Sequence, residues 1–196
     1  MSLTDWLSHI SQVTGTALAR LEDPAVLEEA IADLWLGGAP LDGALQPTVS
    51  APPTLAQARV EFGGTHWSRH LVSNADLKMW GAQLATSRAD ADPDAPALGV
   101  PLQAARDIAR AQGGRLPTLK EWHAAVADAA PGNHSLHWGG PSRPGAFPAA
   151  RSGILDGWGN AWEWTEDGLA VGGSFASPAQ PDPTPNARLT SFRILH

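Results

Sequence analysis

Cysteine and tyrosine are both absent from the 196-residue sequence. Without cysteine the chain cannot form disulfides, thiolate metal sites or a cysteine nucleophile. No run approaches the roughly 18 apolar residues of a membrane-spanning helix, and no basic segment followed by an apolar run marks a signal peptide. We therefore expect a cytoplasmic protein with no membrane partner.

Charge is also scarce. Charged residues make up 17% of the chain, below the roughly 25% of soluble domains. The formal net charge is −7, and no lysine or arginine cluster stands out. A nucleic-acid partner is therefore not expected, because phosphate recognition needs a basic surface.

Glycine, proline and tryptophan are abundant instead. The 20 glycines and 17 prolines favour loops and turns over long helices. The nine tryptophans suit both core layers and binding surfaces, because an indole combines a large apolar face with one N–H donor.

Residues 1–38 are predicted to be helical. Thr4 can cap a first helix, and Asp23 followed by Pro24 indicates the start of a second, which Gly37 would end. Apolar residues recur at helical spacing in both helices. Two interpretations stay open: a helical hairpin packed on the rest of the protein, or a module for docking or self-association.

The remainder divides into a linker and a main domain. Residues 39–56 are rich in proline, glycine, alanine and serine, which is typical of a linker. Residues 57–196 mix short extended pieces with turns and a few helices. Two helices are predicted within them, at Asn74–Leu84 and Leu102–Gln112.

A capping motif is the strongest local signal in the main domain. Within residues 115–122, Thr118 lies three residues before Glu121, so each side chain can bond the backbone N–H of the other residue. Pro117 favours an extended entry to this helix. Trp122 follows as an anchor for the core.

A second motif spans Gly159–Thr165. Alternation along a strand places Trp162 and Trp164 on one face and Glu163 on the other. Further along, a glycine pair is predicted to lead into a short strand, and an arginine, Arg193, lies near the C-terminus. We expect Arg193 to be the structural partner of a carboxylate.

The order of these motifs resembles the formylglycine-generating enzyme (sulfatase-modifying factor) family. The resemblance covers residues 59–196 and implies an α+β, C-type-lectin-like fold with short sheets, two flanking helices and much loop. The chain is similar also to the variable proteins of diversity-generating retroelements. The motifs that carry the resemblance are Arg115–Trp122, Gly159–Thr165, Gly172-Gly173-Ser174-Phe175 and Phe192-Arg193.

Departures from the family pattern change the expected function. The family enzyme oxidises a substrate cysteine with two cysteines and copper, and this chain has no cysteine. Val171 stands where the family has arginine before the glycine pair, and Phe175 stands where it has tryptophan. Residues 176–189, where the enzyme carries its cysteines, are proline-rich. We expect no formylglycine-generating activity.

Metal binding is an open question in the sequence. The resemblance implies a structural Ca²⁺ near Asn160 and Glu163, although these side chains could instead bond the backbone of their turn. No cofactor is otherwise required. His66 and His70 have a spacing seen in metal sites and resemble part of an iron-ligand pattern, but Val72 replaces its third ligand. We expect them to be ordinary histidines.

The favoured function is therefore a non-catalytic protein that binds a protein or a small ligand at its C-terminal face, with a retroelement variable protein as one form of it. One alternative is a metal-dependent oxidoreductase that uses histidines or carboxylates. Another is a structural or adaptor protein of a phage or conflict system, assembled through residues 1–38. The resemblance implies these ligand-binding residues: Trp138, Trp158, Phe175, Ser177, Gln180, Asp182, Asn186 and Arg188.

Overall fold

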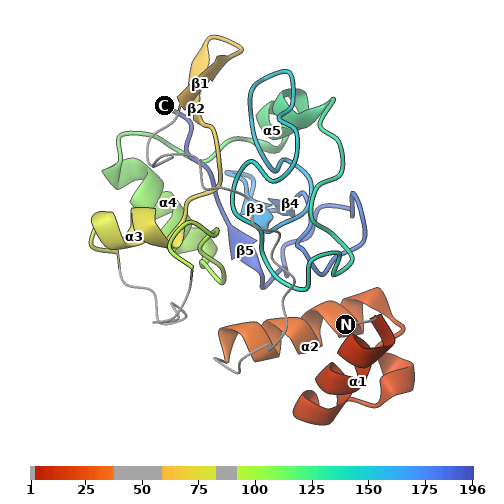
Figure 1. Ribbon diagram of the computed structural model, residues 1–196. Coiled ribbons are helices and arrows are strands. Elements are labelled where there is room, and N and C mark those ends of the chain that lie inside the picture. Colours follow the sequence, from red (N-terminus) through yellow and green to blue (C-terminus); the bar gives the residue numbers. More distant parts are fainter. Residues whose placement is uncertain (1–2, 38–58, 83–91) are drawn as a thin grey trace.

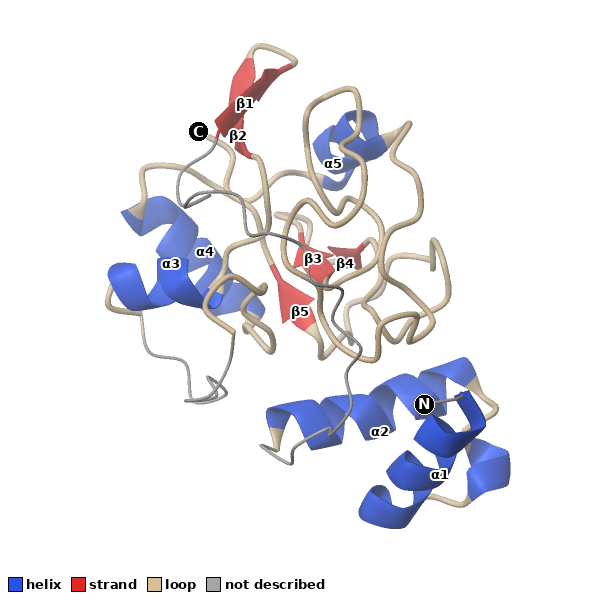
Figure 2. Ribbon diagram, in the orientation of Figure 1, coloured by secondary structure: helices blue, strands red, loops and turns tan. Residues whose placement is uncertain are grey.

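The computed structural model describes residues 3–37, 59–82 and 92–196 (Figure 1). Short helices and strands alternate with long loops in these ranges, which is an α+β arrangement (Figure 2). Within them, no helix is long and apolar enough to cross a membrane. The predicted linker at residues 39–56 lies outside the described residues.

Two helices of the N-terminal segment form a hairpin. α1 spans Leu3–Thr14, a 3-10 turn (η1) spans Leu18–Arg20, and α2 spans Pro24–Leu36. The side chain of Asp23 accepts a hydrogen bond from the backbone of Ala25, which confirms the predicted start of α2.

The first helix begins earlier than the sequence predicted. Thr4 lies inside α1 rather than at its cap, since the helix already includes Leu3. Gly37 follows α2 as its C-cap, with the backbone N–H donating to the carbonyl of Asp33.

A β-hairpin opens the main domain and pairs with the end of the chain. β1 (Arg59–Phe62) and β2 (Thr65–Ser68) are antiparallel. The backbone N–H of Ser68 donates to the carbonyl of Ile194 at 2.8 Å, and Trp67 forms a β-bridge with Leu195. The two ends of the main domain are thereby tied together.

A second, three-stranded sheet has the order β4–β3–β5. β3 (Trp162–Trp164) is antiparallel to β4 (Ala170–Val171) and parallel to β5 (Thr190–Ser191). The glycine pair follows β4 instead of leading into a strand, which corrects the prediction. Gly172 and Gly173 have φ of 87° and 78°, a left-handed conformation that leaves the strand and that glycine adopts readily.

Two helices lie on one side of this sheet (Figure 1). α3 spans Asn74–Met79, shorter than predicted, because Trp80 is its C-cap and Gly81 turns the chain with φ of 69°. α4 spans Leu102–Ala111, one residue short of the prediction.

The predicted capping box begins α5, which spans Leu119–Val126. Thr118 and Glu121 bond each other's backbone as expected. Arg115 adds two hydrogen bonds to the carboxylate of Glu121, at 2.8 and 2.6 Å. Trp122 is fully buried, so the motif directs a large side chain into the core.

The N-terminal hairpin shares its core with the main domain. Ile10 of α1 and Ile31 of α2 are fully buried in the same apolar cluster as Phe175 and Phe192. The structure therefore agrees with a hairpin packed on the main domain; self-association through residues 1–38 stays a prediction. A second cluster forms around Trp122.

Candidate ligand-binding cleft

A single carboxylate oxygen fastens α2 to the C-terminal face of the main domain. Glu28 Oε1 accepts hydrogen bonds from Trp162 Nε1 at 2.6 Å, Ser174 Oγ at 2.6 Å and Ser177 Oγ at 2.8 Å. Hydrogen bonds to an ionised carboxylate are stronger than those between neutral groups. The backbone N–H of Ser174 also donates to Ser177 Oγ, which holds the two serines together.

A second attachment uses two other acidic residues of α2. Arg188 Nη1 donates to Glu29 at 3.0 Å and to Asp33 at 2.5 Å. Beside it, the Trp35 ring packs against Phe175 with a centroid distance of 5.4 Å. Polar and apolar contacts together hold α2 against residues that are far away in sequence.

A cleft of about 490 Å³ lies between α2 and the C-terminal segment. The start of α2 forms one wall, and residues 178–188 form the opposite one. Four carboxylates line the cleft, whereas its one lining cation, Arg188, is already paired with two carboxylates. The cleft is therefore acidic. The four carboxylates belong to Asp23, Glu28, Glu29 and Asp182.

The cleft brings together three of the predicted ligand-binding residues. Asp182, Asn186 and Arg188 all line it. Gln180 is exposed on the same segment, with φ of 52°, but is not among the lining residues.

Phe175 and Ser177 differ from the prediction. Both are fully buried, because Phe175 packs against Trp35 of α2 and Ser177 donates to Glu28. They hold α2 in place and do not form an exposed recognition surface.

The two predicted tryptophans lie elsewhere. Trp138 stacks on Phe147, with ring centroids 4.7 Å apart, and Trp158 packs edge-on against Trp122 at 5.0 Å. Both are half-buried, and neither lines the cleft. Any binding role for them would be separate from it.

The predicted Ca²⁺ ligands have protein partners. Both carboxylate oxygens of Glu163 accept from Arg193, at 2.6 and 2.7 Å. Asn160 Oδ1 accepts from the backbone N–H of Ser142 at 2.7 Å, and its Nδ2 donates to the Ser142 carbonyl at 2.9 Å. A cation would compete with these bonds. Ca²⁺ at this turn therefore stays only the alternative that the resemblance implied. Arg193 has the carboxylate partner expected of it.

Asp156 is a second buried acid close to the Glu163–Arg193 pair. Its φ is 53° and its side chain is 5% exposed. Burial raises the pKa of Asp156 to about 7, and the charge of Glu163 adds to the rise while that of Arg193 opposes it. A carboxyl group with this pKa is largely protonated in mildly acidic solution.

His66 and His70 belong to no cluster of three or more metal-ligating side chains in the described part of the chain. His66 is exposed on β2, and the buried His70 donates from Nδ1 to the carbonyl of Leu71 at 2.8 Å. Across residues 3–37, 59–82 and 92–196, no three histidine or acidic side chains form a group that could hold a metal ion. The geometry gives the oxidoreductase alternative no particular support.

Sequence reasoning missed the residues of α2 that build the site. The sequence analysis nominated none of Glu28, Glu29 and Asp33, because it considered only the apolar residues at helical spacing in this helix. The sequence does contain one signal, because acidic residues recur at helical spacing beside the apolar face that contains Ile31. Nothing in the local pattern says which distant donors those acids meet.

Comparisons with known proteins bear on the fold. No protein-family model matches the chain, and no curated protein matches it by sequence. The structure is similar to that of PvdO from Pseudomonas aeruginosa, with a TM-score of 0.51, 19% identity and coverage of 80% of this chain and 88% of PvdO. It is also similar to CarF, with a TM-score of 0.50, 15% identity and coverage of 67% and 85%. At such identities the likeness concerns the fold alone, and it supports the formylglycine-generating-enzyme-like fold that the motif order indicated.

Proposed function

We propose that this chain is a non-catalytic binding protein whose recognition site is the cleft between α2 and residues 178–188. The observation that carries the proposal is the composition of the cleft: four carboxylates, with its cation already paired. Such a site favours a ligand that presents a positive charge, because unlike charges attract most strongly where a concave wall limits solvent.

The lining also contains apolar surface. Pro178 and Pro181 lie on one wall, and Ala25 and Ala32 lie on the other. Ligand sites commonly combine such apolar walls with a few polar groups that fix orientation. We infer that a peptide segment with lysine or arginine and short apolar neighbours fits the cleft.

Catalysis has little support in the residues of this site. The chain has no cysteine, so the thiol chemistry of the resembled enzyme is not open to it. The two buried hydroxyls, Ser174 Oγ and Ser177 Oγ, donate to Glu28. They act as anchors for a helix, and this role is consistent with a binding scaffold. A retroelement variable protein stays one form of the proposal.

Peptide binding tests the proposal. The probes are two fluorescein-labelled, acetylated pentapeptides, one with two arginines and one with two glutamates between alanines. Fluorescence anisotropy should show that the arginine peptide binds more tightly, with an affinity that falls as salt screens the charges. Equal binding of both peptides, or no binding of either, would contradict the proposal.

Matched variants locate the binding. Asp182→Asn removes an exposed carboxylate of the cleft, whereas Glu61→Gln removes an exposed carboxylate of β1 that does not line it. An exposed charge pair contributes up to about 1 kcal/mol, so Asp182→Asn should weaken the arginine peptide by up to about fivefold. Glu61→Gln should bind like the wild type.

A further inference from the structure

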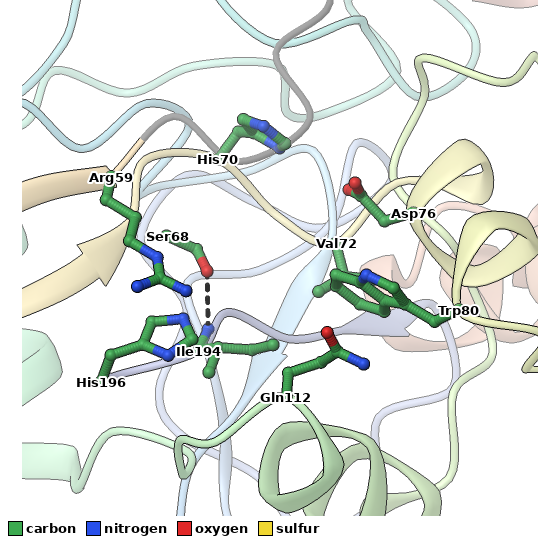
Figure 3. A pocket seen from close by; sticks show the side chains of 9 residues that line it. All are labelled: Arg59, Ser68, His70, Val72, Asp76, Trp80, Gln112, Ile194 and His196. Carbon is green, nitrogen blue, oxygen red and sulfur yellow. Dashed lines mark hydrogen bonds between the residues drawn. The ribbon is translucent and has the colours of Figure 1, made fainter.

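A second pocket, of about 160 Å³, lies where the β1–β2 hairpin, the end of the chain and two helices meet (Figure 3). Its lining shares no residue with the acidic cleft. Several separate elements contribute to it: Arg59 and Ser68 from the hairpin, Asp76 from α3, Gln112 from the end of α4, and His196.

One end of the pocket carries a carboxylate with an unfilled bonding position. Asp76 is 3% exposed. Its Oδ2 accepts from the backbone N–H and the hydroxyl of Ser73, at 2.9 and 2.7 Å. Its Oδ1 is buried and has no hydrogen-bond donor in the described part of the chain. A buried carboxylate oxygen without a donor is destabilising, so a ligand that supplies one would be favoured.

The opposite end carries a cation. Figure 3 shows the guanidinium of Arg59 close to Ser68 and His196, across the pocket from Asp76. Among the described ranges, no ion pair involves Arg59. Burial, and then the charges of Arg59 and His66, hold the pKa of His196 below its ordinary value. At neutral pH His196 is therefore mainly uncharged, and Arg59 supplies the positive charge.

Between these ends the walls are partly apolar. Val72, Trp80 and Ile194 line the pocket, and the amide of Gln112 adds an NH₂ group that donates and a carbonyl oxygen that accepts. A cavity of about 150 Å³ is large enough for a benzene molecule. The pocket therefore has room for a ligand of about six or seven non-hydrogen atoms, by the same comparison.

We propose that this pocket binds a small zwitterion of the amino-acid type, whose ammonium group donates to Asp76 and whose carboxylate accepts from Arg59. The ligand fills the bonding position on Asp76 and pairs the guanidinium at the same time. Its short carbon chain lies against Trp80. The site is independent of the acidic cleft and of the function proposed for it.

Charge spacing is tested with a homologous series. Glycine, β-alanine and 4-aminobutanoate place the two charges at increasing separation, and propylamine and propionate carry one charge each. Binding is followed by the shift of the Trp80 indole N–H signal in ¹H–¹⁵N spectra. One member of the series should bind at least tenfold more tightly than either single-charged compound. If no zwitterion exceeds the amine and the acid, the proposal is overturned.

Two variants test the residues at the two ends of the pocket. Arg59→Gln changes an exposed residue of β1 and should reduce zwitterion affinity at least tenfold. Asp76→Asn can keep the helix cap through its amide oxygen while removing the charge, and should have a similar effect; circular dichroism checks that it folds.

The control, Arg151→Gln, changes a side chain that is 93% exposed outside the pocket. Unchanged binding in Arg59→Gln would overturn the proposal even if Asp76→Asn did not fold. The arginine peptide should bind all three variants like the wild type, so this test fails or succeeds separately from that of the cleft.

Discussion

Glu28 and Ser174 are 146 positions apart in the chain, yet Glu28 Oε1 lies 2.6 Å from Ser174 Oγ. This contact makes an N-terminal helix part of the C-terminal face. It also explains why a face that the family resemblance marked for recognition is partly covered. The acidic cleft beside α2 is the open part of this face. The buried part is the surface that α2 covers.

Replacing Glu28 should loosen the N-terminal hairpin. Glu28→Ala leaves the donors on Trp162, Ser174 and Ser177 without their shared acceptor. We expect a loss of about 2–3 kcal/mol in the free energy of unfolding, measured by urea denaturation. Hydrogen exchange in α2 should accelerate more than exchange in α5.

The matched control for this prediction is Glu29→Ala. Glu29 is exposed and its contact with Arg188 lies at the surface, so the expected loss is below about 1 kcal/mol. Equal losses in the two variants would show that Glu28 is not a specific anchor.

Removing one partner of the buried Glu163–Arg193 pair should strongly destabilise the protein. Their side chains are 1% and 0% exposed, so Arg193→Met leaves a buried carboxylate without its partner. We expect a loss of about 3–5 kcal/mol in urea denaturation. The double variant Arg193→Met/Glu163→Met should lose less stability than Arg193→Met alone. If its loss equals the sum of the losses of the two single variants, the two side chains are not coupled.

The stability of the protein should depend on pH through Asp156. The pKa of its carboxyl group is raised from 3.8 to about 7 in the folded chain. The folded state therefore binds more protons than the unfolded state between these values, and stability falls as pH rises through this window. Above pH of about 7 the loss levels off, since both states are then ionised.

Asp156→Asn isolates this contribution. The variant cannot ionise at this position. The decline of its melting temperature between about pH 5 and about pH 7 should therefore be smaller than that of the wild type. Parallel pH profiles for the two proteins would contradict the assignment.

Chelation tests the cation prediction. Because Glu163 is bonded to Arg193 and Asn160 to the backbone of Ser142, we expect EDTA and added Ca²⁺ to leave the melting temperature unchanged. A fall in EDTA that Ca²⁺ reverses would show that a cation holds this turn, as the family resemblance implied. Mass spectrometry of the purified protein would identify the metal.

Local patterns predicted the elements that depend on neighbouring residues. The Thr118–Glu121 capping box and the start of α2 at Asp23 both came from short-range chemistry, and both are confirmed. The end of α3 was missed, because helical periodicity continued to Leu84 while Gly81 turns the chain at positive φ.

The long-range part of the site could not be predicted in this way. Asp182, Asn186 and Arg188 were nominated by family resemblance, and all three line the cleft. Phe175 and Ser177 were nominated on the same ground but are buried, because the covering helix comes from a segment outside the resemblance. Periodicity identified α2 as amphipathic, but the partners of its acidic residues depend on tertiary structure.

The most direct test of the binding account is a chemical-shift map of the ¹⁵N-labelled protein during titration with the arginine pentapeptide. The account predicts shifts at the Trp162 indole N–H and at the amides of Asp182 and Asn186, with little change at Trp138 and Trp158. Shifts confined to Trp138 and Trp158 would place recognition at these two tryptophans instead of in the cleft. No shift at any cleft residue would contradict the central claim that the cleft between α2 and the C-terminal segment is the recognition site.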